Sequence, residues 1–221
     1  MATRIENPEM SSIINREATA RTLYYIPIIH SQSDMGTLSE SIRRTAHQKL
    51  GREKWQQKVR TIDQCWEEID RVLDAAALPP AKVRLYQDGL PVCSHVSEIV
   101  RDLVTKGSKN YQILLRLMEK GATITGTESP ELLIKEYHLA KKAFAGPGAR
   151  ENDRTDSGRH AESDILLKQR DAYIAQRINS TLGAGETGVL FLGLLHNVEH
   201  LLDRDIMVLY PISRPLIKRV A

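Results

Sequence analysis

Residues 188–196 read GVLFLGLLH, an uncharged run that ends in His196. A continuous apolar run of this kind is typical of a strand that is buried on both faces, as in a parallel sheet. A second run, Leu23–Ile29 (LYYIPII), ends in the same way at His30. Pro27 within it is unusual, because proline lacks the N–H of a ladder and prefers sheet edges. These two runs predict the buried strands of a sheet.

Shorter strand-like runs and helical patterns alternate along the rest of the chain. The further strands are expected at 82–86, 122–126 and 206–209. Helices are expected at about 38–50, 52–77, 94–105, 109–120, 130–144 and 157–182, with a short one from Val198. Strands that are separated by helices pair in parallel through crossover units. The sequence therefore predicts an α/β fold with a mostly parallel central sheet flanked by helices.

The length of 221 residues and a hydrophobic fraction of 41% suit a single globular domain. Residues 1–20 are polar and are expected to form an N-terminal arm, which leaves 21–221 as the α/β domain. The stretch 145–156 (AGPGARENDRTD) is rich in Gly, Pro and charge, and predicts a flexible loop inside that domain.

The charge balance selects no partner, whereas the cysteine content bears on the compartment. The 31 basic and 28 acidic residues are interspersed, which gives no clear sign of nucleic-acid binding. Cys65 and Cys93 have no CxxC spacing and fit a reducing compartment. The N-terminus has no signal-peptide pattern, and no window approaches the ~18 apolar residues of a membrane span. We therefore expect a cytoplasmic protein.

Ionisable side chains follow four of the predicted strands: His30, Asp88, Glu128 and His196. Ligands of parallel sheets bind beyond the carboxyl ends of the strands. An imidazole there can bind a metal or transfer protons, and a carboxylate can act as a base, a ligand or an orienting group. The alternatives are structural. Each histidine would cap a strand, Asp88 would be a turn residue, and Glu128 would be an anion at a helix start.

Two further features lie near the last strong strand. Arg170, next to Asp171 on the predicted long helix, could hold a carboxylate or polarise a carbonyl oxygen, or could belong to a solvated helix face. His196 and His200 are four residues apart in the order HNVEH, which is not the HExxH order of zinc proteases. The sequence contains no GxSxG elbow and no glycine-rich phosphate loop.

Four stretches of the chain share the pattern of a known superfamily. They are the predicted helix 169–178 leading into the strand and histidine of 188–196, YIPIIH at 25–30, ATITGTESPE at 122–131, and LYQD at 85–88. On these stretches the chain resembles the TraB/TIKI superfamily, which includes GumN-type proteins and is related to the ChaN and erythromycin esterase group. Pro27 stands where the family has glycine, and Asp88 stands where it has glutamate. The resemblance implies an α/β fold, histidines and acids in one cleft, and hydrolytic activity of some members.

The leading hypothesis is a hydrolase that acts on an amide or ester bond of a small-molecule or peptide substrate. His30 and His196 would either hold a divalent metal ion, with Glu128 as a further ligand, or serve as base and stabiliser. Glu128 would be the base or a ligand, Asp88 a ligand or orienter, and Arg170 an oxyanion contact.

Two alternatives stay open. In one, the same cleft binds a ligand or haem without turnover. In the other, the protein is a homo-oligomer whose contacts are made by the helices around Trp55–Trp66 and Arg159–Leu182.

Overall fold

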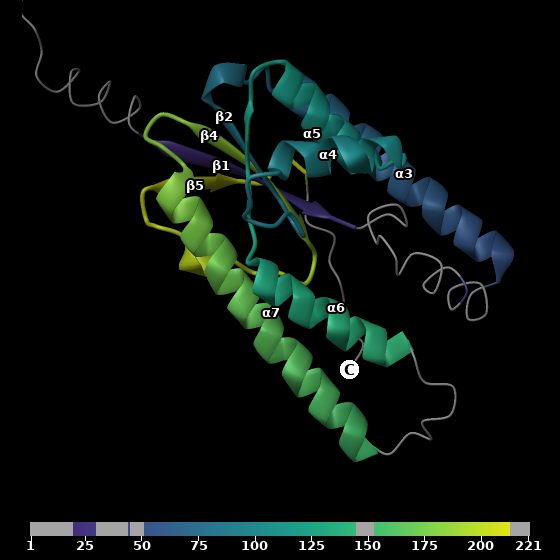
Figure 1. Ribbon diagram of the computed structural model, residues 1–221. Coiled ribbons are helices and arrows are strands. Elements are labelled where there is room, and N and C mark those ends of the chain that lie inside the picture. Colours follow the sequence, from purple (N-terminus) through teal and green to yellow (C-terminus); the bar gives the residue numbers. More distant parts are fainter. Residues whose placement is uncertain (1–19, 30–43, 45–50, 145–152, 213–221) are drawn as a thin grey trace, which may run out of the picture.

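The fold is built on a five-stranded sheet in which every pair of neighbouring strands is parallel (Figure 1). A computed structural model describes residues 20–29, 44, 51–144 and 153–212. The strands are β1 Arg21–Ile28, β2 Val83–Gln87, β3 Thr123–Thr125, β4 Thr187–Gly193 and β5 Ile206–Leu209. Their order is β3-β2-β4-β1-β5, so the most apolar run of the sequence forms the middle strand. The predicted parallel α/β fold is confirmed.

Helices cover both faces of this sheet. They are α3 Arg52–Ala75, α4 Val96–Thr105, α5 Lys109–Glu119, α6 Pro130–Phe144 and α7 Asp153–Thr181. The helices α3, α4 and α5 pack on one face, and α7 packs on the other with α6 alongside it (Figure 1). The stripe of α3 is buried through Ile62, Trp66, Ile69 and Leu73, as core packing requires.

Alternate residues of the central strands feed the two cores. In β4, Phe191 lies in the core under α3 to α5, whereas Leu190 lies in the core under α7. A strand that is covered on both faces needs apolar residues at every position, which explains the continuous runs. Pro27 is accommodated because the pairing of β1 with β5 extends only to Tyr24, so that β1 has β4 as its one paired neighbour at Pro27.

The predicted start of the last long helix is wrong by four residues. Helix α7 begins at Asp153, so residues 153–156 of the expected loop are helical, whereas 145–152 lie outside the described residues. The stretch 153–156 (DRTD) contains no apolar residue, so a search for an apolar stripe does not detect it. The predicted helix at 38–50 and the predicted arm also lie outside the described residues, apart from Arg44 and Ala20.

Two further findings concern the cysteines and the helices of the described residues. Cys65 and Cys93 are both exposed, with free thiols. Within residues 20–29, 44, 51–144 and 153–212, no helix combines the length and the apolar character that crossing a membrane takes.

The chain leaves the neighbouring strands β2 and β4 toward opposite faces. From β2 it continues into α4, whose Val100 lies in the core with α3 and α5. From β4 it turns into the short 3₁₀ helix η3 (Glu199–Leu201), and Val198 before it lies in the core with α7. Where adjacent parallel strands diverge in this way, a crevice opens beyond their carboxyl ends. The fold therefore opens a crevice between the carboxyl ends of β2 and β4.

Candidate functional site

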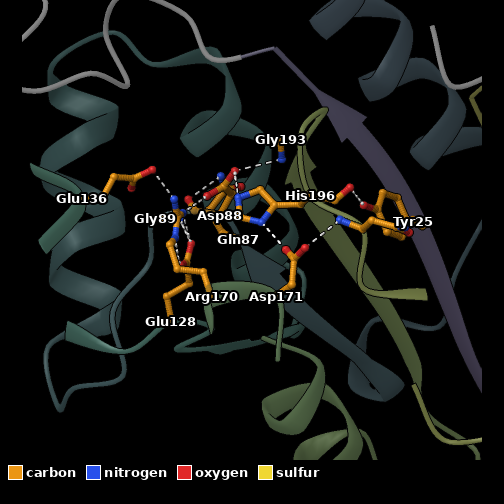
Figure 2. A network of polar contacts seen from close by, with 11 residues as sticks. Tyr25, Gln87, Asp88, Gly89, Glu128, Glu136, Arg170, Asp171, Gly193 and His196 are labelled. Atoms are coloured by element: carbon orange, nitrogen blue, oxygen red, sulfur yellow. Dashed lines mark hydrogen bonds and ion pairs between the residues drawn. The ribbon is translucent and has the colours of Figure 1, made fainter. Parts of the chain in front are cut away.

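A cavity of about 620 Å³ lies at the carboxyl ends of β1, β2 and β4. Its polar wall includes Gln87, Asp88, Glu136, Arg170 and His196. These side chains form one network of polar contacts together with Glu128 and Asp171 (Figure 2). Three of the predicted site residues thus line one cavity, and a fourth, Glu128, contacts them.

Arg170 stands at the centre of the acidic side chains. Its Nε and Nη2 donate to the two oxygens of Glu128 at 2.6 and 2.7 Å, and Nη2 also donates to Asp88 Oδ1 at 2.9 Å. Nη1 donates to Glu136. Burial disfavours the charged guanidinium, but these three carboxylates raise the pKa of Arg170 above its ordinary value. Arg170 is therefore a permanent cation held by acids.

Glu128 is held on its other side by the backbone. Its Oε1 accepts the N–H of Gly89 at 2.7 Å, and its own carbonyl accepts the N–H of Val92 at 2.8 Å. The neighbouring Gly126 permits this approach, because a Cβ there would lie 2.7 Å from the carbonyl oxygen of Pro91. Burial raises the pKa of Glu128, and this effect outweighs the opposing contact with the guanidinium.

Asp88 joins the ends of β2 and β4. Its N–H donates to the carbonyl of Phe191, and its Oδ2 accepts the N–H of Gly193, both at 2.9 Å. The same Oδ2 lies 3.6 Å from Nε2 of His196. Asp88 therefore fixes the start of the turn that carries the histidine.

His196 forms a buried pair with Asp171. Its Nδ1 lies 2.6 Å from Asp171 Oδ1, while Asp171 Oδ2 accepts the N–H of Asn197 at 3.1 Å. Burial lowers the pKa of His196, but Asp171 and then Asp88 outweigh it, so that the pKa is raised. With Nδ1–H donated to the carboxylate, the neutral ring keeps its lone pair on Nε2, the nitrogen nearer Asp88. This is the arrangement of an oriented acid–base histidine.

The site includes residues that the sequence interpretation did not place there. Asp171 was noted only as a charged neighbour of Arg170, and Glu136 and Gln87 were not considered. The spacing along α7 could have indicated that Arg170 and Asp171 are buried. The buried residues at 166, 170, 174, 178 and 182 are spaced by four, and so are those at 171 and 175. Arg170 and Asp171 thus continue the buried stripe of α7, which a charged pair on a solvated face would not do.

Of the two other histidines of interest, His200 lies among the described residues. It is exposed in η3, apart from the network. His30 lies outside the described residues, and the last described residues before it, Ile28 and Ile29, line the cavity. Whether two imidazoles share the cavity therefore stays a prediction.

The described acids do not fit a divalent cation. Both oxygens of Glu128 and both oxygens of Asp88 already accept N–H groups, and Arg170 supplies the positive charge between them. Among residues 20–29, 44, 51–144 and 153–212, no group of three or more His, Cys, Asp or Glu is arranged to hold a metal. The expected ligand set also includes His30, so the metal site stays a prediction and no step below uses it.

Comparisons of this chain with protein-family models, with curated proteins and with solved structures find no match. The resemblance to the TraB/TIKI superfamily stays a prediction that rests on the quoted motifs. The geometry of the cavity is therefore the basis of a functional assignment.

Proposed function

We propose that the protein is a hydrolase that cleaves an amide or ester bond, with His196 as its general base. The observation that carries the proposal is the buried Asp171–His196 pair, of which His196 lines the cavity. A carboxylate on one ring nitrogen and an accessible cavity beside the ring is the arrangement that proton transfer needs. Of the two roles expected for the histidine, the proposal takes that of base.

In the proposed reaction, Nε2 of His196 removes a proton from a water molecule in the cavity. The hydroxide attacks the carbonyl carbon, and Asp171 stabilises the imidazolium that has formed. Nε2–H then donates the proton to the leaving nitrogen or oxygen as the bond to carbon breaks. The products are a carboxylic acid and an amine or alcohol, and the histidine returns to its neutral form.

The other charged residues act through His196. Arg170 holds Asp88, and Asp88 holds the N–H of Gly193 at the start of the turn to His196. The proposal gives Arg170 and Asp88 a positioning role, because the guanidinium that was expected to contact an oxyanion is already bound by three carboxylates. Glu128 keeps Arg170 in place.

Hydrolysis of fluorogenic amide and ester panels tests the proposal. His196→Ala is expected to lower kcat/KM at least a hundredfold, because general acid–base catalysis contributes factors of about 10² to 10⁴. His200→Ala is the matched control, since that histidine is exposed and four residues away. The proposal fails if the wild-type protein hydrolyses neither panel, or if His196→Ala retains the activity.

A second function, binding without turnover, is favoured by the apolar part of the wall. Ile28, Leu103, Leu133 and Leu167 line the same cavity. A ligand that raises Tm while remaining chemically unchanged, in wild type and in His196→Ala alike, would support this function in place of hydrolysis.

A further inference from the structure

One polar atom in the wall of the cavity has no partner. Gln87 is fully buried, and its Nε2 donates to the carbonyl of Asp88 at 3.0 Å. Its Oε1 accepts no hydrogen bond within the described part of the chain. The amide of Asn110 is also buried without a partner there, but only Gln87 lines the cavity. An unsatisfied buried acceptor is costly, and a ligand that donates to it removes this cost.

Among the described residues, the charges of the network do not balance. The network contains four acidic side chains, those of Asp88, Glu128, Glu136 and Asp171. The described part of the chain places one guanidinium and one imidazole opposite them. The acids therefore remain in excess within this network even when His196 is protonated and Glu128, whose pKa is raised, is neutral. The excess reaches the surface, because the Glu136 side chain is 47% exposed while it lines the cavity. A negative cavity attracts cations and repels anions.

Apart from Tyr111 and Tyr137, the remaining side chains of the wall are apolar, and they come from both faces of the sheet. Leu103 belongs to α4, whereas Leu133 and Ala140 belong to α6 and Leu167 to α7. A ligand that fills the cavity therefore needs an apolar body as well as a polar end.

We propose that the cavity binds an ammonium group on an apolar body, with the ammonium donating to Gln87 Oε1 and offsetting the acidic excess. The inference rests on the proposed function in one respect: the amide or ester that is cleaved carries this cationic group. Gln87 is then a specificity-determining residue, since its Oε1 accepts a hydrogen bond from the substrate, and Glu136 attracts the cation at the rim.

Three probes share an apolar body and differ in the charge and hydrogen-bonding capacity of the polar end: 2-phenylethylammonium, 2-phenylethanol and phenylacetate. Calorimetric titration of the wild-type protein is expected to give affinities in the order ammonium, alcohol, carboxylate. The alcohol retains a donor for Gln87 but lacks the charge, and the carboxylate lacks the donor and carries the repelled charge. Equal affinities, a preference for the carboxylate, or binding of none of the three overturns the inference.

Substitutions test the two contacts separately. Gln87→Met keeps the length of the side chain but removes the acceptor, and is expected to weaken ammonium binding about tenfold, as loss of a hydrogen bond to a charged group does. Gln176→Met is the control, because Gln176 is exposed on α7 and does not line the cavity. An unchanged affinity in Gln87→Met overturns the role of Gln87.

Glu136→Gln keeps an acceptor for Arg170 and removes one rim charge. It is expected to weaken binding of the ammonium probe several-fold and binding of the alcohol hardly at all. This test does not depend on whether Gln87→Met folds. Equal losses for both probes would overturn the role of charge.

These outcomes are distinguishable from failure of the proposed function. Selective ammonium binding without hydrolysis supports the inference and contradicts hydrolysis. Hydrolysis of uncharged substrates with no preference for an ammonium supports hydrolysis and overturns the inference.

Discussion

Two arginine–glutamate pairs at opposite ends of the same strands have nearly the same contact geometry. At the amino ends of β2 and β4, Arg84 donates from Nε and Nη2 to the two oxygens of Glu186, both at 2.8 Å. At the carboxyl ends, Arg170 donates from Nε and Nη2 to the two oxygens of Glu128 at 2.6 and 2.7 Å. Contact geometry alone does not distinguish the two.

Their surroundings are opposite. The side chains of Arg84 and Glu186 are 23% and 25% exposed, whereas those of Arg170 and Glu128 are 5% and 1% exposed. The hydrogen bond from Arg84 lowers the pKa of Glu186, but burial raises the pKa of Glu128 despite the same kind of contact. The difference shows that desolvation decides the behaviour of the buried carboxylate.

The comparison indicates which end of the sheet is specialised. A half-solvated pair contributes little to stability, and a buried pair is no better than a well-packed apolar replacement. The buried end also brings in Asp88, Glu136 and the Asp171–His196 pair. Perturbed, buried ionisable groups beside a cavity are typical of functional sites. The carboxyl end therefore has the features that the proposed function requires, whereas the amino end has those of a structural ion pair.

The largest expected effect comes from breaking the buried pair. Arg170→Met leaves Glu128 and Asp88 buried without their cation, and is expected to lower the free energy of unfolding by about 3–5 kcal/mol, measured in urea. A loss below about 1 kcal/mol would mean that the acids are neutral or solvated, and would contradict the contrast drawn here.

The next effect concerns His196. Asp171→Asn removes the carboxylate on Nδ1, and is expected to lower the pKa of His196, because the contact with Asp171 is the largest effect that raises it. An NMR titration of the imidazole measures the shift. The stability that the raised pKa provides is present below the ordinary value of 6.5 and is lost as pH rises through the folded pKa. An unchanged pKa in the variant would show that Asp171 does not control the ring.

A third prediction uses pH to separate the two glutamates. Stability from Glu186, whose pKa is lowered, is present above the ordinary value of 4.5 and is lost as pH falls through the folded pKa. For Glu128, whose pKa is raised, stability is present below 4.5 and is lost as pH rises through the folded pKa.

The measurement is the free energy of unfolding in urea at a series of pH values between pH 3 and pH 8. Relative to wild type, Glu186→Gln is expected to become less stable as pH rises, whereas Glu128→Gln is expected to gain stability. Parallel curves for the two variants would contradict opposite shifts of pKa.

The sequence predicts the sheet and several groups of the site for one physical reason. A strand that is buried on both faces is apolar at nearly every position, so the end of β4 is visible where the apolar run stops before His196. The shorter strand β2 contains Arg84 and Gln87, and its end is marked by the turn residues from Asp88. Parallel topology then brings these ends to one edge. Glu128 follows the same rule after β3, and Arg170 continues the buried stripe of α7.

The remainder depends on tertiary placement. Glu136 is half-exposed on α6 and has the sequence context of a surface residue, so that only the packing of α6 beside α7 assigns it to Arg170. Gln87 carries no charge that would set it apart from a turn residue. The role of Asp171 depends on the rotation of α7 relative to the turn after β4, which the apolar stripe constrains but does not fix.

The smallest expected effect is the matched substitution at the amino end. Arg84→Met is expected to lower the free energy of unfolding by at most about 1 kcal/mol. In the variant, water can hydrate the carboxylate of Glu186, which still accepts the N–H of Gly183. Screening by salt should reduce this cost further, whereas the cost of Arg170→Met should hardly change between low and high salt. If both variants lose the same free energy, the bidentate contact itself sets the energy. Burial would then no longer explain why the pKa values of Glu128 and Glu186 shift in opposite directions.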